Sequence, residues 1–359
     1  MEIFGFLDLF SFTILPLSDK IDTSIINFKF MRKVALFFGG LGNEASVSVV
    51  SATNVAANFD QKRQRLVLVY WHRDGYFYKL EKMADAKKPS VKKRLAVSDF
   101  KKYFDSALLM THGRYGEDGV LQGILESQKI PYSGCGVLSS ALCMDKAVFK
   151  LLMSGQKIPQ VPFFLLDYSR HSQKELSAIV ANAQKKLRLP VYVKPANSGS
   201  SVGISKLDSW KQLVAALKEA RRHDYKIILE QGLVKPREIE VAVLGNDKLT
   251  VSRPGELRLP QDFYDFEEKY QKGRTEVLIP APLEKKQEKY IQELAAQAYR
   301  LADCRGFSRV DFFLSGKKLY LNEINTLPGF TDISMYPQLM MKMGMSYSGL
   351  INKLIDLAA

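Results

Sequence analysis

The sequence predicts an α/β protein with an N-terminal doubly wound parallel sheet followed by two α+β regions. Three observations lead to this expectation. A short apolar strand at 34–38 runs into the glycine-rich turn 39–44 and then into a helix that ends near Asn58, which is a βα unit. The chain from 161 to 244 alternates strands and helices in an α+β pattern. Residues 309–329 form two apolar runs around a short polar turn, which is typical of a β-hairpin.

The composition is that of a globular protein with two or three domains. The chain has 359 residues, of which 46% are apolar, and contains no run of 18 apolar residues that would span a bilayer. Its three cysteines lack a C-x-x-C pair and are too few for a disulfide framework. We therefore expect Cys135, Cys143 and Cys304 to be buried thiols in a reducing cytoplasm.

The formal net charge is +14, and part of it is concentrated between Lys79 and Lys102. Basic runs bind nucleic acid in some proteins, but no nucleic-acid motif or aromatic interleaving accompanies this one. We interpret it as a solvated face and expect no nucleic-acid partner. A basic balance also suits a site for polyanionic nucleotides and carboxylates.

Residues 1–30 differ from the rest of the chain. They are rich in Phe, Leu and Ile but carry Glu2 and Asp8 where a signal peptide carries Lys or Arg. We interpret them as an appended segment outside the fold, which then begins at Met31; an amphipathic membrane-associated tail is the alternative. The predicted domains are an N-terminal one at 31–134, a central one at 135–233 and a C-terminal one at 234–359.

Two glycine-containing loops follow strands of the N-terminal region. The first allows a ligand to approach the helix N-terminus, and its Glu44 either serves that ligand or stabilises the helix dipole. Strand 66–70 and a hairpin at Asp74-Gly75 come next. Strand 107–110 then leads into the second loop, in which His112 contacts a substrate or braces the loop.

The middle of the chain offers cationic and flexible candidates. We expect one helix from Leu138 to about Ser154, on which Lys146 taken alone would face solvent. Lys194 ends an apolar strand, and the small-residue loop 196–204 after it offers successive backbone donors. Such a loop folds over phosphates as a flap or is a flexible hairpin turn; it lacks the spacing of a P-loop.

The segments before the hairpin are a helix at 209–222, strands at 227–230 and 238–244, and a helix at 284–304. The long polar and aromatic loop 260–275 lacks helix or strand periodicity. A loop of this length in a compact domain is more often functional than idle.

The hairpin carries the strongest chemical signal. Side chains alternate along a strand, so Arg309 and Asp311 share one face of the first strand, and Glu323 and Asn325 share a face of the second. Three oxygen ligands on adjacent strands suit Mg²⁺, and an arginine beside them can stabilise a reacting oxygen. The alternative is a surface hairpin, in which acids inside apolar strands would be costly.

Together these segments resemble the ATP-grasp ligases, and within them the D-alanine–D-alanine ligases. The resemblance covers residues 31–359, keeps the family's order and departs from it at Gly42, where many members carry Ser. It rests on seven segments, at 39–48, 112–119, 144–146, 193–203, 230–232, 264–270 and 309–335. It implies an ATP-grasp fold, in which the central and C-terminal domains sandwich ATP beside a Rossmann-like N-terminal domain.

The resemblance also implies a role for each matching residue. The catalytic set would be Glu44, Ser200, Tyr270, Arg309 and Gly329; ATP would be bound by Lys146, Lys194, Ser201, Glu230, Gln231, Leu233, Glu238 and Lys269; metal ions by Asp311, Glu323 and Asn325; and the amino-acid substrates by Glu44, His112, Ser334 and Met335.

The implied activity is ATP-dependent ligation of two D-alanines through an acyl phosphate, with release of ADP and phosphate, for peptidoglycan precursor synthesis. Two Mg²⁺ (or Mn²⁺) ions would accompany ATP. The family further implies a cytoplasmic homodimer without nucleic acid or stable membrane association. A D-alanine–D-lactate or other ATP-grasp amino-acid ligase is the alternative, and Tyr270 speaks against D-lactate because ligases that prefer it tend to carry Phe there. A non-catalytic nucleotide-binding module is a third reading, but it would not need metal ligands and Arg309 together.

Overall fold

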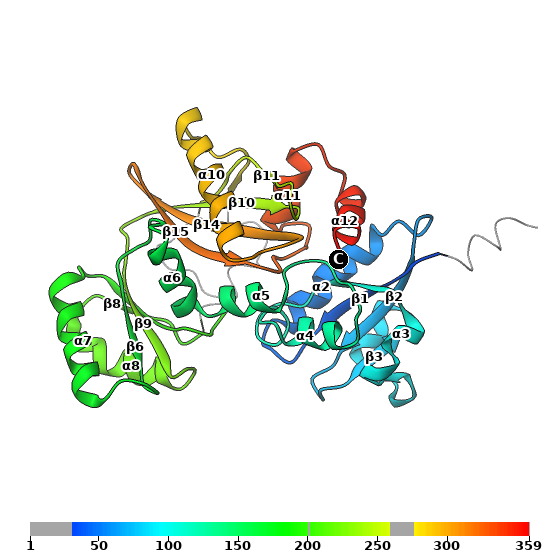
Figure 1. The fold of residues 1–359 in the computed structure, drawn as a ribbon, viewed down its shortest axis with the longest axis horizontal. Coiled ribbons are helices and arrows are strands. Elements are labelled where there is room, and N and C mark those ends of the chain that lie inside the picture. Colours follow the sequence, from blue (N-terminus) through cyan, green and yellow to red (C-terminus); the bar gives the residue numbers. More distant parts are fainter. Residues whose placement is uncertain (1–30, 200–201, 259–275, 359) are drawn as a thin grey trace, which may run out of the picture. The chain divides into compact units, whose positions relative to one another are not determined.

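Three β-sheets organise the described part of the chain, which in this computed structural model is residues 31–199, 202–258 and 276–358 (Figure 1). Arg32–Ala359 form one compact unit. The predicted segment 1–30 lies outside the described residues, and the domain boundaries at 134 and 233 stay a prediction.

The N-terminal sheet has the order β4-β3-β2-β1-β5. Its strands β2, β1 and β5 are parallel, and β1 is buried along almost its whole length, as expected where helices cover a parallel sheet. The α/β class is confirmed, and β3 and β4 add an antiparallel extension, because a hairpin with Gly75 at φ +88° reverses the chain. The elements are β1 (Lys33–Gly39), α2 (Ala45–Ala57), β2 (Arg65–Trp71), β3 (Phe77–Leu80), β4 (Arg94–Leu95), α3 (Phe100–Tyr103), β5 (Ser106–Leu109) and α4 (Val120–Ser127).

The basic segment 79–102 lies at the β4 edge of this sheet. It is built from short turns of 3-10 helix, η1 (Met83–Lys87), η2 (Val91–Lys93) and η3 (Val97–Asp99), and most of its lysines are exposed. Glu81 pairs with Lys93 at 2.7 Å, and Asp99 pairs with Lys102 at 2.7 Å. The segment is a solvated face of the described structure.

The predicted helix 138–154 is wrong in one respect, because it consists of two helices, α5 (Val137–Met144) and α6 (Lys146–Gly155). Asp145 breaks it. The Asp145 carboxylate accepts hydrogen bonds from the backbone N–H groups of Ala147 and Val148, both at 3.1 Å, and so caps α6. Lys146 therefore begins a helix, and its Nζ donates to the Ser198 carbonyl at 2.9 Å instead of facing solvent.

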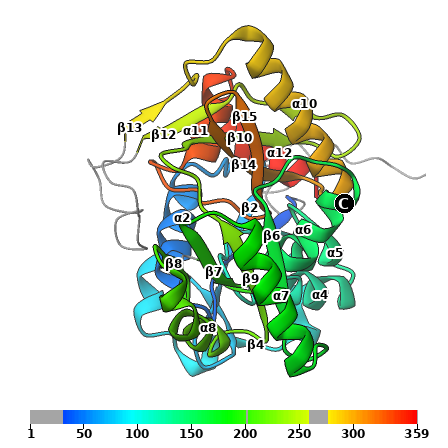
Figure 2. The same cartoon turned by 90° about the vertical axis from the view of Figure 1, so that its left-hand side faces the viewer.

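The second sheet is antiparallel, with the order β6-β9-β7-β8. Odd-numbered residues of β9, such as Ile227 and Leu229, pack against α7 and α8, and even-numbered ones point to the other face, where Ile228 packs on Ala147 of α6. Figures 1 and 2 show α7 and α8 beside this sheet. The elements are β6 (Phe163–Asp167), α7 (Gln173–Lys186), β7 (Val191–Pro195), β8 (Ser205–Leu207), η4 (Trp210–Gln212), α8 (Leu213–Arg221) and β9 (Lys226–Gln231).

The third sheet contains the predicted hairpin as β14 and β15 and has the order β13-β12-β10-β14-β15, with β11 paired to β10. Val241 of β10 and Val310 of β14 share a core with α10, whereas Ala242 and Leu244 belong to the core that contains α11. Alternation thus leaves polar residues of β10 and β14 on the face opposite α10. The elements are β10 (Arg237–Leu244), β11 (Thr250–Val251), β12 (Gly255–Arg258), β13 (Glu276–Leu278), α10 (Lys285–Leu301), β14 (Phe307–Ser315), β15 (Lys318–Asn325), α11 (Met335–Lys342) and α12 (Tyr347–Asp356).

Two sequence expectations about burial can be checked. All three cysteines are buried and free, which confirms the predicted thiols. Among the described residues, no helix combines the length and the apolar character needed to cross a membrane.

Candidate active site

One cavity of about 720 Å³ gathers most of the predicted site residues. Its lining includes Lys146, Lys194, Asp311, Glu323 and Asn325, which had to share a cleft for a nucleotide site to exist. Glu44, His112, Glu238, Arg309, Gly329, Ser334 and Met335 line it as well. Glu230, Gln231 and Leu233 are not part of the lining, and Ser200, Ser201, Lys269 and Tyr270 lie outside the described residues.

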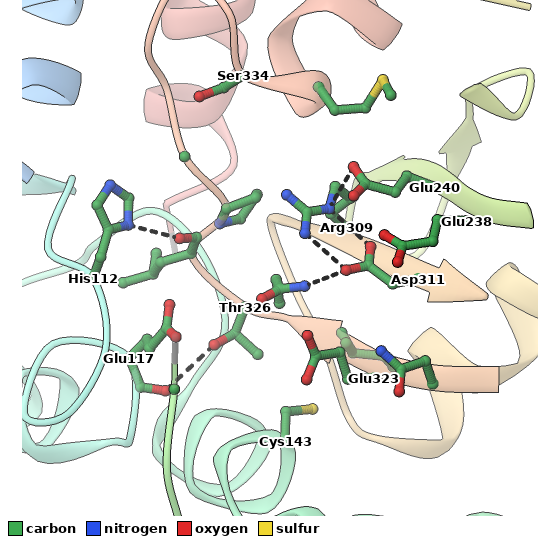
Figure 3. Close-up of a pocket in the computed structure, with 18 of the residues that line it drawn as sticks. His112, Glu117, Cys143, Glu238, Glu240, Arg309, Asp311, Glu323, Thr326 and Ser334 are labelled. Carbon is green, nitrogen blue, oxygen red and sulfur yellow. Dashed lines mark hydrogen bonds and ion pairs between the residues drawn. The ribbon is translucent and has the colours of Figure 1, made fainter. Parts of the chain in front are cut away.

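The third sheet supplies a wall of carboxylates. Glu240 of β10 stands opposite Asp311 of β14, and Asp311 stands opposite Glu323 of β15. Residues in register on neighbouring antiparallel strands share a face, so the three carboxylates form a row across the sheet. Figure 3 shows this row, with Glu238 beside it and Arg309 above Asp311.

Arg309 is the cation of this wall. Its Nε and Nη2 donate to the two oxygens of Asp311 at 2.8 and 2.7 Å, and its Nε lies 2.9 Å from Glu240 Oε2. Burial acts to lower the pKa of Arg309, but Asp311 and Glu240 outweigh it and hold that pKa well above its usual range. Asn325 Nδ2 also donates to Asp311 at 2.8 Å.

The chemistry of this wall fits a hard cation. Asp311, Glu323 and Asn325 place oxygen donors on one face of two strands, the ligand type that Mg²⁺ prefers. Burial, followed by the neighbouring acids Glu44 and Glu323, raises the pKa of Glu117 at this cavity to about 8. Within the described ranges no group of three or more His, Cys, Asp or Glu residues is arranged to hold a metal.

The opposite wall is cationic and comes from β7, β9 and α6. Lys194 of β7 contacts the Glu230 carboxylate, and Lys150 Nζ lies 2.5 Å from the other oxygen of Glu230. Lys150 and Glu230 are only 3% and 2% exposed. Burial acts to raise the pKa of Glu230, but Lys150 and Lys194 outweigh it and lower that pKa to about 2.

A second ion-pair network fixes the start of the loop 196–204. Asp145 contacts Lys226, and Asn197 donates through its backbone N–H to Asp224 at 2.8 Å. Lys146 reaches from this network to the carboxylate wall, with its Nζ 3.5 Å from Glu323. The loop therefore leaves β7 from a fixed base at the edge of the cavity.

Glu44 lies close to two loops, the one that contains Gly113 and the one that contains Gly199. It precedes α2 and makes no capping hydrogen bond through its side chain. A Cβ added at Gly113, which has φ +67°, would lie 2.0 Å from Glu44 Oε2, and one added at Gly199 would lie 3.4 Å away. A side chain at position 113 would be strained by the left-handed backbone conformation, and the Glu44 carboxylate would also have to move.

His112 is buried, with both ring nitrogens occupied. Nδ1 lies 2.9 Å from the Leu327 carbonyl, which can only accept, so Nδ1 carries the proton. Nε2 then accepts from Ser51 Oγ at 2.9 Å, and Ser51 Oγ accepts from the Phe330 backbone N–H at 3.2 Å. Burial keeps the pKa of His112 below its usual value. This series of hydrogen bonds holds Leu327 and Phe330, on either side of Gly329. It favours the interpretation that His112 braces this region over the one in which His112 contacts substrate.

Ser334 and Met335 complete the far end of the cavity at the start of α11. Ser334 Oγ lies 2.8 Å from Thr331 Oγ1 and accepts from the Thr331 backbone N–H at 3.0 Å. A Cβ at Gly329 would lie 2.8 Å from Ser334 Oγ, so this segment passes close to the serine.

Three residues that the resemblance assigns to ATP binding, Gln231, Leu233 and Glu238, are only partly in place. The Gln231 backbone N–H donates to the Pro162 carbonyl at 2.9 Å and is therefore already used within the fold. Leu233 is half-buried, and Glu238 is half-buried at the cavity.

Sequence reasoning missed three charged residues of the cavity, namely Glu117, Lys150 and Glu240. Lys150 follows Lys146 by four residues, so both share a face of α6. Glu240 follows Glu238 by two residues, so both share a face of β10. These spacings were available signals, whereas nothing local to Glu117 reveals its acidic neighbours.

Comparison with known proteins agrees with this geometry. Family models described as "D-ala D-ala ligase N-terminus" and "D-ala D-ala ligase C-terminus" match residues 33–135 and 152–356. The chain is 43% identical to a D-alanine–D-alanine ligase of Caldicellulosiruptor bescii, covering 91% of this chain and 94% of the relative, and 40% identical to one of Chloroherpeton thalassium, covering 91% and 96%.

Solved structures give the same result. A VanG D-Ala:D-Ser ligase from Enterococcus faecalis is similar with a TM-score of 0.81 and 34% identity, covering 92% of this chain and all of that one. The D-alanine–D-alanine ligase from Coxiella burnetii is similar with a TM-score of 0.76 and 29% identity, covering 91% and 94%. The carboxylate row, the facing lysines and these similarities lead to one conclusion: the chain belongs to the D-alanine–D-alanine ligase family.

Proposed function

We propose that this protein joins two D-alanines to D-alanyl-D-alanine with ATP, releases ADP and phosphate, and serves peptidoglycan precursor synthesis. The observation that carries the proposal is the single cavity in which Lys146 and Lys194 face Asp311, Glu323 and Asn325. A site for a metal-bound triphosphate needs both kinds of group within one cleft.

The cationic side binds the nucleotide. Lys146 and Lys194 hold the α- and β-phosphates, and Lys269 reaches the γ-phosphate. Backbone groups of Gln231 and Leu233 read adenine, and Gln231 contributes its backbone carbonyl. Glu238 binds the ribose. Glu230 acts on the nucleotide indirectly, because its carboxylate holds Lys150 and Lys194.

Asp311, Glu323 and Asn325 would hold the two Mg²⁺ (or Mn²⁺) ions. When bound, these ions would neutralise negative charge on the phosphates. The chain's own part is to keep the three oxygen donors on one face of β14 and β15.

Arg309 and the Gly329 N–H stabilise the reacting oxygens. The carboxylate of the first D-alanine, with its ammonium held by Glu44, attacks the γ-phosphate and forms an acyl phosphate and ADP. The amine of the second D-alanine then attacks the acyl carbon, and phosphate leaves from the tetrahedral intermediate. Hydrogen-bond donors aimed at the developing oxyanion lower both barriers.

His112, Ser334 and Met335 shape the pocket for the second D-alanine. His112 acts by holding the Leu327–Phe330 segment through Ser51. Ser334 and Met335 contact the substrate carboxylate. The segment that carries the Gly329 N–H is thus fixed before substrate arrives.

Closure of two loops excludes water from the acyl phosphate. A hydrogen-bond chain from Glu44 through Tyr270 to Ser200 holds them shut, and Ser201 contributes to the phosphate-binding flap. The position of Glu44, whose Oε2 would lie 3.4 Å from a Cβ added at Gly199, supports this arrangement, because Gly199 precedes Ser200.

A second candidate is ligation of D-alanine to D-serine or D-lactate. The similarity to the VanG D-Ala:D-Ser ligase favours D-serine as a second acceptor. Tyr270 favours an amine over a hydroxyl acceptor. We further propose that the enzyme works in the cytoplasm as a homodimer, in keeping with its nucleotide substrate and its family.

The test is ATP-dependent phosphate release by the purified chain with D-alanine alone and with D-alanine paired to D-serine or D-lactate. Mass spectrometry identifies the product. We expect D-alanyl-D-alanine as the main product and no phosphate release without D-alanine. Phosphate release that does not depend on D-alanine, with no dipeptide, would contradict the proposal.

A further inference from the structure

Arg309 has a second acidic partner, Glu240, which no role has yet explained. Glu240 is 6% exposed, and its Oε2 lies 2.9 Å from Arg309 Nε. The same Nε donates to Asp311 Oδ1 at 2.8 Å, so two carboxylates share one edge of the guanidinium (Figure 3). A buried carboxylate is stabilised by a nearby cation, so Arg309 in turn stabilises the charge of Glu240.

Asp311 has two tasks that compete. Both of its oxygens accept hydrogen bonds from Arg309, and Asn325 donates to Oδ2 as well. A cation held by Asp311 needs at least one of the same oxygens. If Asp311 were the only acid beside Arg309, the guanidinium would oppose the cation, or the cation would displace the guanidinium from the reacting oxygens.

We propose that Glu240 is a positioning residue that keeps Arg309 in the cleft while Asp311 turns to a cation. The inference rests on the proposed function of Arg309 and Asp311 and adds a residue to it. With Glu240 in place, Arg309 exchanges one carboxylate for the other and loses little of its electrostatic stabilisation. The oxyanion group and the cation site can then be filled at the same time.

The strand order makes Glu240 suited to this task. β10 lies between β12 and β14, so the backbone of Glu240 is fixed from both sides. Glu240 is in register with Asp311, and such neighbours have Cβ atoms about 5 Å apart. One guanidinium can therefore bridge both carboxylates without moving its own backbone.

The chain offers a matched control in Glu256 of β12. Glu256 is 2% exposed and accepts from Arg237 Nε at 3.0 Å and Nη2 at 2.7 Å. It is in register with Ile239, so it points to the face opposite Glu240. Glu256→Gln removes a buried ion pair from the same sheet without touching the cavity.

The test compares Glu240→Gln, Glu240→Asp and Glu256→Gln with the wild type. Because Arg309 is proposed to act on the transition state, we expect Glu240→Gln to lower kcat about tenfold or more, with the KM for ATP at saturating Mg²⁺ within about twofold. Glu240→Asp keeps the charge but withdraws the carboxylate by one methylene group, and we expect the same loss. Glu256→Gln should keep kcat within about threefold of the wild type, even if its Tm falls as much as that of the Glu240 variants. Normal kcat in either Glu240 variant, or equal loss of kcat in Glu256→Gln, would overturn the proposal.

A second measurement does not depend on turnover. Mn²⁺ binding, followed by electron paramagnetic resonance with a non-hydrolysable ATP analogue, should weaken about tenfold in both Glu240 variants and stay unchanged in Glu256→Gln. Wild-type affinity in Glu240→Asp would mean that only the charge matters and would refute positioning. A wild type that binds Mn²⁺ but forms no dipeptide would count against the proposed function alone, and the Mn²⁺ comparison would still decide the role of Glu240. If Glu240→Gln does not fold, Glu240→Asp carries both measurements.

Discussion

The two walls of the cleft are rich in charges of opposite sign, and they are built from different secondary-structure elements. Among the described residues, the third sheet presents Glu238, Glu240, Asp311 and Glu323 against one guanidinium, Arg309. The wall formed by the second sheet and α6 presents Lys146, Lys150 and Lys194, with Glu230 buried behind two of them.

The difference shows how a protein keeps like charges together before its ligand arrives. Each wall contains one counter-ion, Arg309 or Glu230, that contacts two opposite charges at once. A buried charge without such a partner would be strongly destabilising. One wall is therefore rich in carboxylates and the other in lysines, so each wall can be tested separately.

Removing the central lysine should have the largest effect. Lys194→Ala deletes a proposed phosphate ligand, and we expect ATP-dependent phosphate release with D-alanine to fall at least ~10³-fold. A coupled phosphate assay measures it. Lys206→Ala is the control, because Lys206 lies in the neighbouring strand β8 and pairs with Asp208 at 3.3 Å. Near-normal turnover in Lys194→Ala would place the nucleotide elsewhere.

Weakening the anionic wall should come next. Glu323→Gln removes one negative charge from the carboxylate row. We expect the Mg²⁺ concentration for half-maximal activity to rise about a hundredfold. Titration with Mg²⁺ at saturating ATP measures the shift. Excess Mg²⁺ should restore part of the activity, and an unchanged Mg²⁺ requirement would show that Glu323 is not a ligand.

Replacing Lys150, the buried lysine of the cationic wall, should have a moderate effect. Lys150→Met leaves Glu230 with Lys194 alone, so that Lys194 is drawn away from the phosphates. We expect the KM for ATP to rise about tenfold, which corresponds to about 1.4 kcal/mol. Lys157→Met, just beyond the end of α6 and exposed, is the control. Equal KM values for the two variants would argue against the pairing as a device for binding.

A smaller effect is expected from the loop 260–275, which is proposed to close over the cleft. Tyr270→Phe removes one hydroxyl from the proposed chain with Glu44 and Ser200. We expect the ratio of D-lactate to D-alanine incorporation to rise roughly three- to tenfold, the value of one hydrogen bond. Product analysis with paired acceptors measures the ratio, and Tyr264→Phe in the same loop is the control. An unchanged ratio would contradict this role of Tyr270.

The smallest effect concerns stability and pH. The pKa of Glu230 is lowered to about 2 in the folded chain, whereas an unfolded glutamate titrates near pH 4.3. A carboxyl whose pKa is lower in the folded state stabilises the fold above its unfolded pKa. We therefore expect the difference in urea midpoint between wild type and Glu230→Gln to be constant from pH 7 to about 5 and to shrink as the pH falls from about 4.5 towards 2. A constant difference over the whole range would mean that Glu230 titrates normally.

The local pattern predicted much of the fold and of the candidate site. Periodicity located the strands of the N-terminal region and the β14–β15 hairpin, because alternation and turn chemistry act within a few residues. It also predicted that Asp311 and Glu323 lie on adjacent strands of the hairpin, and the structure puts them directly opposite each other. The helix break at Asp145 was missed, although an aspartate before a helical run is a capping signal.

Other features depend on contacts between segments far apart in the sequence. The pairing of Lys150 with Glu230 joins residues 80 positions apart in the numbering, and the chain from Phe330 through Ser51 and His112 to Leu327 joins the N- and C-terminal parts. No local pattern encodes such a contact, because it arises only when the sheets and α6 pack together.

The sequence alone thus determined which residue types stand at each strand end and which of them share a face, since backbone geometry fixes side-chain direction within an element. The tertiary structure decided which faces meet. It made Glu230 the counter-ion of two lysines and gave Arg309 its second carboxylate, because buried charges from separate elements are stabilised by pairing with one another.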